Sequence, residues 1–404
     1  MLFREASVAR SAAGLPCGTR LTDFISLGVL TRAVPLAHIH AALERTGRRQ
    51  RDLPAHVTVY DVIALALSMH ASSREVLRCL LEGLRWLLGP EARLKVAGKS
   101  GISQARTRLG PDPLRHLHDE LIRPIALETT RGAWYRGWRL VSLDGSTLDV
   151  ADTAQNEAAF GRPGASRGGS AFPQIRFVSL VENGTHVLFG TRMSGYATGE
   201  TALAAQALSV LGPGMLCLAD RQFLGYALWS QAQATGTDLL WRAKANARLD
   251  CEQALPDGSY LSRIYAGTSD RRNQRNGILV RAIDYRLEGV GGAEPVYRLV
   301  TTILDPGEAP AEDLAALYHE RWEVETALDE VKTHLRGRQV VLRSKTPDPV
   351  RQEFWGLLLA HFAVRGLIHE AALRADEDPD RLFYAALPPS AEGGRSSSGA
   401  AGDP

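Results

Sequence analysis

Residues 140–145 read LVSLDG, an apolar run that ends at Asp144 and Gly145. Such a run followed by an Asp-Gly pair is typical of a buried strand that stops at a turn. The pattern recurs at residues 215–220, MLCLAD, where a second apolar run ends at Asp220. A carboxylate at the end of a central strand lies near the sheet edge where α/β folds place their ligands. An Asp-Gly pair after a strand is more often a plain turn, so neither aspartate alone identifies a site.

The chain around these two runs alternates short apolar segments with polar turns, from residue 134 to about residue 305. Segments 175–180 and 185–190 flank the dipeptide Asn183-Gly184, which favours a hairpin. Helical patterns lie between and after the strands. This mixture predicts an α/β (α+β) domain, which we place at residues 136–375.

The region before this domain is helical throughout. Apolar residues recur at three- and four-residue spacing, for example in 59–67 and 76–84. We therefore expect an all-helical N-terminal domain at residues 21–130. Residues 1–20 are expected to be a flexible N-terminus. Residues 385–404 are rich in Pro, Ser, Gly and Ala and are expected to be a disordered tail.

The composition of the 404 residues is ordinary for a globular protein, with 45% hydrophobic and 23% charged residues. A mainly disordered, collagenous or fibrous chain is therefore excluded. No apolar run approaches the roughly 18 residues of a membrane span, and no secretory signal follows the N-terminus. The cysteines lie far apart, which argues against a disulfide framework or a cysteine zinc site. We expect a soluble protein of a reducing compartment.

The charge is distributed unevenly along the chain. Residues 1–140 contain 21 Lys and Arg against 12 Asp and Glu, whereas the remainder contains 26 against 33. A basic front half suits a phosphate-rich partner, because each Lys or Arg that neutralises a phosphate releases counterions. Arginine-rich helices without such a partner would give the same count. The basic segment 95–108 is our candidate for contact with such a partner, and a solvated helix face would have the same composition.

A helix predicted at residues 311–335 carries four functional side chains on one face. At about 100° per residue, an arc of about 60° contains Tyr318, Arg321, Glu325 and Lys332. An apolar stripe beside this arc is expected to pack on the sheet. Glu323, Glu330 and His334 fall on the far side and are expected to be solvated. A surface helix with i,i+4 ion pairs would show the same spacing.

The run YHERWEVE (318–325), continued to Lys332, matches the pattern Y-x2-R-x3-E-x6-K. It resembles the signature of the DDE transposases of the insertion element four family. In that resemblance Asp144 is similar to the first catalytic acid of the family, Asp220 to the second and Glu325 to the third. The segments DTAQN (152–156) and FGRP (160–163) also resemble these transposases. The resemblance extends over residues 20–375.

The resemblance implies an RNase H-like catalytic core with a β-rich insertion at about 225–305, preceded by a helical DNA-binding domain. It implies that Asp144, Asp220 and Glu325 bind two Mg²⁺ ions, with Mn²⁺ as a substitute. Hard oxygen ligands suit Mg²⁺, and two ions can assist in-line phosphoryl transfer.

The implied activity is metal-dependent cleavage at the ends of an insertion element and strand transfer into target DNA. The implied partners are the terminal inverted repeats and target DNA, with a homodimer in the synaptic complex, no membrane, and association with the nucleoid.

The resemblance assigns Tyr318, Arg321 and Lys332 to phosphate binding beside the cleavage point. Trp241 is a candidate for stacking on an unpaired base, although a Trp in an apolar run is usually part of a core. Asp149 and Asp152 are alternative acids near the first site, and Asp329 is a lesser rival to Glu325.

Two other functions remain open at this stage. One is a non-catalytic DNA-binding protein derived from a transposase, or an inactive truncated copy, which the atypical C-terminal tail would suit. The other is a nuclease that cuts without joining. The complete acidic triad and the complete Tyr-Arg-Glu-Lys pattern favour the transposase.

Overall fold

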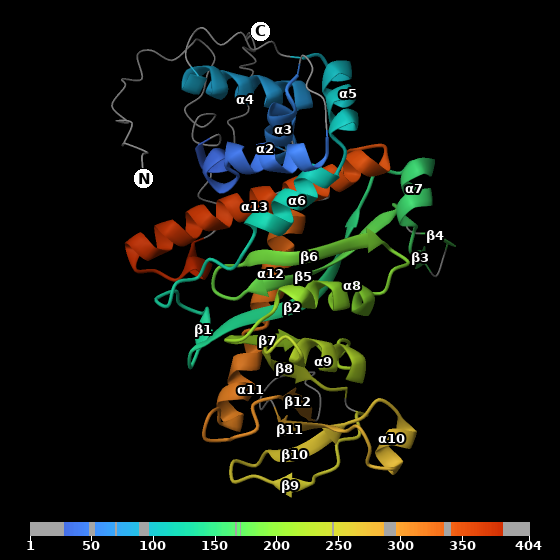
Figure 1. Ribbon diagram of the computed structural model, residues 1–404, viewed down its shortest axis with the longest axis vertical. Coiled ribbons are helices and arrows are strands. Elements are labelled where there is room, and N and C mark those ends of the chain that lie inside the picture. Colours follow the sequence, from blue (N-terminus) through green and yellow to red (C-terminus); the bar gives the residue numbers. More distant parts are fainter. Residues whose placement is uncertain are drawn as a thin grey trace, which may run out of the picture.

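The structure, a computed structural model, describes residues 28–47, 53–68, 71–88, 97–165, 168–169, 171–244, 246–286, 296–334 and 341–382. The expected flexible start (1–20) and disordered tail (385–404) lie outside these residues. In Figure 1, helices of the N-terminal region lie at the top, a mixed sheet occupies the middle and further strands extend it at the bottom.

The N-terminal region consists of helices. They are α2 (Leu36–Arg45), α3 (Ala55–Leu67), α4 (Ser73–Leu88), α5 (Lys99–Leu109) and α6 (Asp112–Leu121). Helix α3 is apolar on most sides and is buried because α2, α4 and α5 pack around it. This arrangement confirms the all-helical region expected from the three- and four-residue spacing.

A mixed sheet of ten strands forms the centre of the described chain, in the order β6-β5-β2-β7-β8-β12-β11-β10-β9, with β1 beside β2. The strands are β1 (Trp134–Tyr135), β2 (Trp138–Asp149), β5 (Gln174–Glu182), β6 (Val187–Gly195), β7 (Met215–Ala219), β8 (Asp238–Arg242), β9 (Gln253–Ala254), β10 (Tyr260–Ile264), β11 (Ile278–Tyr285) and β12 (Tyr297–Thr301). β7 is parallel to β2 and β8 is parallel to β7, whereas the other pairs are antiparallel. Two short strands, β3 (Gly164–Ala165) and β4 (Gly168–Gly169), form a separate two-stranded sheet. Along the chain they lie between β2 and β5.

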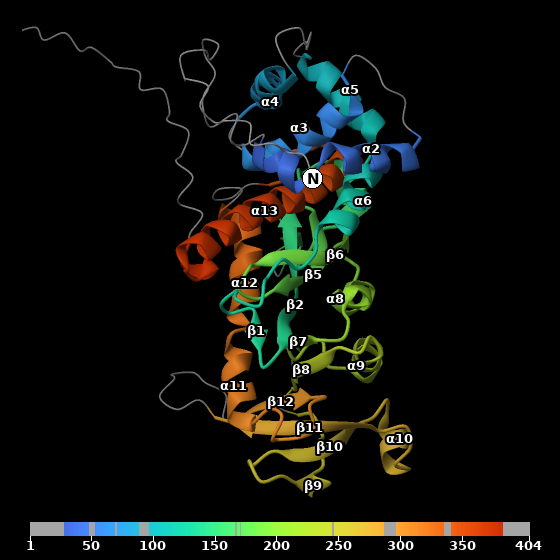
Figure 2. The ribbon, with the colours of Figure 1, turned by 60° about the vertical axis from the view of Figure 1, so that its left-hand side comes forward.

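Helices cover both faces of the sheet. Figure 2 shows α8 (Glu200–Ala207) and α9 (Tyr226–Gln233) on one face, and α11 (Ala311–His319) and α12 (Trp322–Asp329) on the other. α8 and α9 are the crossovers that make β7 and β8 parallel to β2, since parallel neighbours need such a connection. The mixed α/β fold is therefore confirmed, and its strand order fits the expected RNase H-like core.

The strand-rich segment 225–305 continues this sheet. Its first elements, α9 and β8, belong to the parallel part, and β12 pairs with β8. β11, β10 and β9 then extend the sheet outward, with the short helix α10 (Thr268–Arg272) between β10 and β11.

The longest helix, α13 (Pro347–Ala375), joins the two regions, because it contacts α3 and α6 on one side and β6 on the other. It is long and apolar enough to cross a membrane, but 61% of its most apolar stretch of 18 residues is buried inside the protein. It is therefore a core helix of this fold. The close approach to α3 occurs at Gly356, where a Cβ atom would lie 2.9 Å from Val62 Cγ1 and 3.0 Å from the Val62 carbonyl oxygen.

Two predicted boundaries are wrong. β2 does not end at Asp144-Gly145 but continues to Asp149, because β5 pairs with it along its whole second half. The helix predicted at 311–335 is interrupted at Glu320 and Arg321, where amides bond to the carbonyl three residues earlier. Residues Glu330–His334 then form a wider π turn, η3, and Leu335 lies outside the described residues.

Replacement of Gly356 by Val should destabilise the protein by about 1–3 kcal/mol, because the added methyl groups meet the α3 backbone in a packed interface. Gly366→Ala in the same helix is the matched control. A Cβ at Gly366 has no neighbour within 4 Å, so this change should stabilise by about 0.5–1 kcal/mol. Urea unfolding measures both, and a Gly356→Val protein as stable as wild type would disprove the close contact.

Candidate active site

Asp144 and Asp220 lie side by side because their strands are parallel neighbours. The last paired residues of β2 and β7 are Leu143 and Ala219, and each aspartate is the next residue in its chain. Beyond this pair β2 continues alongside β5 alone, which leaves room beside Asp144. Two acids far apart in sequence therefore meet at one end of the parallel strands.

Glu325 is brought to this pair by Arg321, the residue at the break between α11 and α12. Arg321 Nη1 lies 3.3 Å from Asp144 Oδ2, and Arg321 Nη2 lies 2.9 Å from Glu325 Oε1. One guanidinium thus donates hydrogen bonds to a strand carboxylate and a helix carboxylate. The side chains of Arg321 and Asp144 are mostly buried, with 16% and 22% of their surfaces exposed, whereas Glu325 is 43% exposed.

The electrostatics show that all three acids share one environment. Burial raises the pKa of Asp144, the Gly145 amide and Arg321 oppose this shift, and Asp220 and Glu325 add to it. Burial tends to lower the pKa of Arg321, but Tyr318 and the three acids together raise it. The site therefore concentrates negative charge that needs a cation.

Tyr318 anchors α11 to the end of β7. Its hydroxyl donates a hydrogen bond to the carbonyl oxygen of Ala219, at 3.2 Å, and burial raises its pKa. This contact places the phenol beside Asp220. Lys332 lies further along, in η3, where its Nζ is 3.9 Å from Asp329 and its side chain is 35% exposed.

The donor set of the three acids fits a hard divalent cation. All the available ligand atoms are carboxylate oxygens, which Mg²⁺ prefers over nitrogen or sulfur. Burial, with a smaller contribution from Asp220 and Glu325, raises the pKa of Asp144, and a bound cation would oppose both effects. In the structure the guanidinium of Arg321 supplies positive charge at this position.

The rival acids have other partners. Asp149 accepts a hydrogen bond from Gln174 Nε2 at 2.8 Å, and Asp152 pairs with Arg162 at 2.5 Å. Asp329 pairs with Lys332. The contacts of these three acids thus lie apart from Arg321.

Trp241 does not reach the site, and its candidacy for base stacking is wrong. It is fully buried in β8, where its ring packs edge-on against Trp229 with centroids 5.2 Å apart. Its position in β8, a central strand of the sheet flanked by β7 and β12, explains this burial.

Two residues near the acids escaped the sequence analysis. Trp322, directly after Arg321, is 67% exposed, which is unusual for a tryptophan. Its position next to Arg321, within the pattern that contains Tyr318 and Glu325, could have marked it as a candidate site residue. Glu200, in the first turn of α8, lies so close to Gly145 that a Cβ there would be 2.8 Å from its carboxyl carbon. No local pattern marks Glu200, because its position depends on the crossover after β6.

The far side of α12 is buried rather than solvated, contrary to expectation. Glu330 is 6% exposed and contacts His186 Nδ1 at 3.0 Å, His361 Nε2 at 3.1 Å and Arg365 Nη1 at 3.3 Å. Burial opposes ionisation of Glu330, but these partners hold its pKa below the usual range. Glu323 accepts a hydrogen bond from the Gly184 amide, and burial raises its pKa to about 8. The side chain of His334 lies outside the described part of the chain.

A polar pocket separates α5 from the start of α13. Its lining includes Lys99, Lys345, Ser103 and Thr346. Arg106 lines it as well but is buried, and its guanidinium contacts Gln352 and Glu353 of α13. Within the basic segment 95–108, Lys99 is thus exposed, whereas Arg106 is buried and connects α5 to α13. Lys95 lies outside the described residues.

Two regions of the chain match known families. Residues 24–119 match the family described as insertion element 4 transposase N-terminal, and residues 136–363 match the transposase DDE domain. The second match alone covers more than half of the chain, and it includes Asp144, Asp220 and Glu325.

The transposase InsG for insertion sequence element IS4 of Escherichia coli (strain K12) is a relative, 27% identical over 322 residues. The alignment covers 78% of this chain and 70% of that protein. Among solved structures, the piggyBac transposase synaptic complex with hairpin DNA aligns with 88% of this chain and 67% of its own, at 13% identity and a TM-score of 0.41.

Replacement of Arg321 by Gln should lower the free energy of unfolding at neutral pH by roughly 1–2 kcal/mol. It removes two hydrogen bonds to carboxylates, one of them partly exposed. The loss should shrink as the pH is lowered, because Asp144, whose pKa is already raised, then takes up a proton. Thermal unfolding without divalent ions at several pH values measures the effect.

Arg351→Gln is the matched control, since Arg351 pairs with Asp348 on the surface of α13. It should change stability by less than about 0.5 kcal/mol at any of these pH values. Equal effects of the two substitutions would contradict a special role for the Arg321 guanidinium.

Proposed function

The chain belongs to the insertion element 4 family of DDE transposases and acts in DNA transposition, and we propose that Asp144, Asp220 and Glu325 are its catalytic acids. In this proposal the protein cleaves the ends of an insertion element and joins them to target DNA. The observation that carries the proposal is that the guanidinium of Arg321 contacts Asp144 and Glu325, while Asp220 follows the strand that pairs in parallel beside Asp144.

The three carboxylates would bind divalent metal, which DDE transposases use, and we propose two Mg²⁺ ions, with Mn²⁺ as a substitute. When bound, such ions activate the attacking oxygen and stabilise the leaving oxygen of a phosphodiester. The chain's own contribution is to fix the acids: parallel pairing positions Asp144 and Asp220, and α12 positions Glu325.

Arg321 and Lys332 are proposed to bind phosphates of the transferred strand, whereas Tyr318, predicted to share this role, has its O–H buried against the Ala219 carbonyl and is proposed to position Arg321. Arg321 offers a planar, bidentate donor set, and Lys332 a compact charge that is partly exposed. Tyr318 lies between Arg321 and the end of β7, where its buried hydroxyl fixes the start of this face. Trp322 replaces Trp241 as the candidate for stacking on an unpaired base, because its ring is exposed beside Arg321.

The DNA partner is proposed to contact the N-terminal helices as well. Lys99 and Lys345 approach one pocket from α5 and from the segment before α13, so a single phosphate backbone can meet both. The terminal inverted repeats and target DNA are the proposed ligands, a homodimer is the proposed synaptic form, and the bacterial cytoplasm is the proposed location. The domains are proposed at 21–130 and 136–375.

Asp144→Asn, Asp220→Asn and Glu325→Gln should each slow Mg²⁺-dependent cleavage and joining by more than about 1,000-fold, because each removes a ligand for the catalytic cation. Binding to element ends should remain. Labelled element ends and a target plasmid measure all three steps. Asp152→Asn is the matched control, since Asp152 pairs with Arg162, and it should stay active.

Other outcomes of this assay would point to the other functions. End binding without any cleavage by the wild-type chain would favour a non-catalytic DNA-binding protein. Nicking without joining would favour a nuclease. Activity in any of the three acid variants would remove that acid from the proposed site.

The double substitution Lys99→Gln and Lys345→Gln should weaken binding to element ends. The slope of log K against log salt concentration should fall by about 0.9 for each phosphate that the variant no longer neutralises. Arg263→Gln on β10, which removes one charge at the far end of the sheet, should leave this slope unchanged. An unchanged slope in the double variant would exclude the pocket from the DNA interface.

A further inference from the structure

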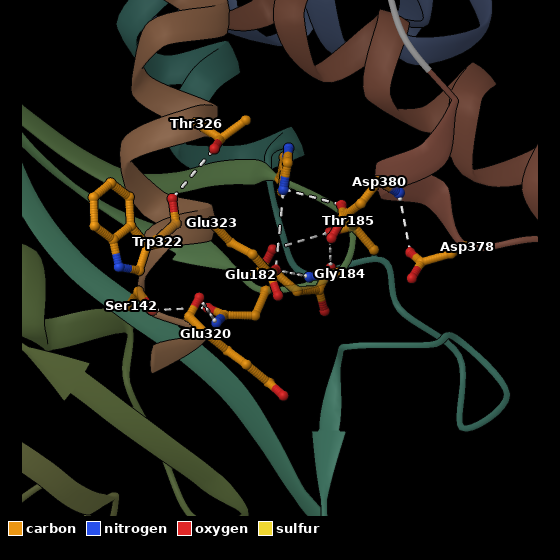
Figure 3. Close-up of polar contacts among 12 residues, drawn as sticks. Ser142, Glu182, Gly184, Thr185, Glu320, Trp322, Glu323, Thr326, Asp378 and Asp380 are labelled. Carbon is orange, nitrogen blue, oxygen red and sulfur yellow. Dashed lines mark hydrogen bonds and ion pairs between the residues drawn. The ribbon is translucent and has the colours of Figure 1, made fainter. Parts of the chain in front are cut away.

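A second cluster of ligand-type side chains lies on the opposite side of α12 from the acids. His186 in the turn between β5 and β6, Glu323 in α12 and Asp380 in the short 3₁₀ helix η4 (Pro379–Arg381) each offer one atom, and these atoms lie within 4.8 Å of one another. Figure 3 shows Glu323 and Asp380 reaching toward one another from α12 and from the segment after α13. Among the residues that the structure describes, these three offer ligand atoms close enough together for one metal ion.

Buried polar atoms in the cluster lack hydrogen bonds. His186 is 3% exposed, and its Nε2 has no hydrogen-bond partner, although it lies 3.0 Å from Asp380 Oδ1 and 4.0 Å from Glu323 Oε2. Asp380 Oδ1 is also buried without a hydrogen bond. At this distance the two atoms form an ion pair when the imidazole is protonated, and a metal cation can take the place of that proton.

We propose that His186, Glu323 and Asp380 form a binding site for a transition-metal cation such as Zn²⁺. One imidazole nitrogen and two carboxylate oxygens are common ligands of Zn²⁺, whereas Mg²⁺ avoids imidazole. The site therefore differs in ligand chemistry from the all-oxygen set of Asp144, Asp220 and Glu325.

The surrounding contacts are those that orient metal ligands in proteins. A metal-bound histidine usually gives its other ring N–H to a carboxylate, and His186 Nδ1 lies 3.0 Å from Glu330 Oε1. Glu330 is fixed in turn by His361 and Arg365, and Glu323 by the Gly184 amide. These partners set the ring orientation of His186 so that its Nε2 faces the two ligand carboxylates.

The charge of the cluster can be balanced by a cation. When all are ionised, Glu323, Glu330 and Asp380 carry three negative charges, and Arg365 carries one positive charge close to Glu330 and 3.9 Å from Asp380. With neutral imidazoles one divalent cation then neutralises the cluster. Without metal, protons on His186 and on Glu323, whose pKa burial raises to about 8, supply this balance, so metal binding releases protons.

The site would link parts of the chain that are far apart in sequence. It connects η4, which follows α13, to the β5–β6 turn and to α12, two residues before Glu325. A bound cation would thus stabilise the orientation of the helix that carries the third acid, without touching the reacting DNA.

Zn²⁺ binding to the full chain tests the proposal, in a background with Asp144→Asn, Asp220→Asn and Glu325→Gln so that the acids of the active site cannot bind the ion. Isothermal titration and metal analysis after dialysis should show stoichiometric Zn²⁺ that excess Mg²⁺ does not displace. Asp380→Asn and His186→Gln should each weaken binding by more than roughly 100-fold, since even loss of an outer partner costs about 10–100-fold.

Glu377→Gln is the matched control, because Glu377 is an exposed acid of the same segment, and it should bind Zn²⁺ like the background chain. Asp380 lies on a short peripheral turn with a partly exposed side chain, so Asp380→Asn should fold even if His186→Gln does not. In that case the Zn²⁺ affinity of the Asp380→Asn variant tests the proposal. A background chain that binds no Zn²⁺, or equal binding by the Asp380→Asn and Glu377→Gln variants, would overturn the proposal. Neither result depends on cleavage or joining, so the proposed function is tested separately.

Discussion

The site depends on one electrostatic constraint: three carboxylates meet at the end of two parallel strands, and their repulsion must be balanced. The guanidinium of Arg321 balances part of it by contacting Asp144 on β2 and Glu325 on α12. The same contact holds α12 against the sheet. It is possible because α11 and α12 are separate helices, and the tighter turn at residues 320–321 directs Arg321 toward the strands. This one interaction thus both balances charge among the acids and holds α12 in position.

Much of this arrangement could be predicted from the sequence, for local reasons. An apolar run that ends in an acid identifies Asp220, and the spacing of Tyr318, Arg321 and Glu325 survives the break because 3₁₀ and α turns both keep the backbone near αR. Asp144 was found for a partly wrong reason. Its strand does not end there, and what ends is the parallel pairing with β7, which local sequence does not show.

The failures concern contacts with distant segments. Glu323 and Glu330 were expected in solvent because a helical wheel shows only which residues share a face, not what packs against it. Their partners come from the β5–β6 turn and from α13, more than 30 residues away in either direction. The two tryptophans show the same limit: β8 is central because of β12, which buries Trp241, while most of the Trp322 side chain is exposed.

Helix α13 packs against both the N-terminal helices and the sheet. Its N-terminal half packs on α3 at Gly356, and other turns contact α6, β6 and the π turn that follows α12. The N-terminal helices and the sheet therefore share a single core, and neither can separate from the other without exposing apolar surface. Among the described residues, a rotation of these helices relative to the sheet would thus cost the burial of the side chains that α13 covers on both sides.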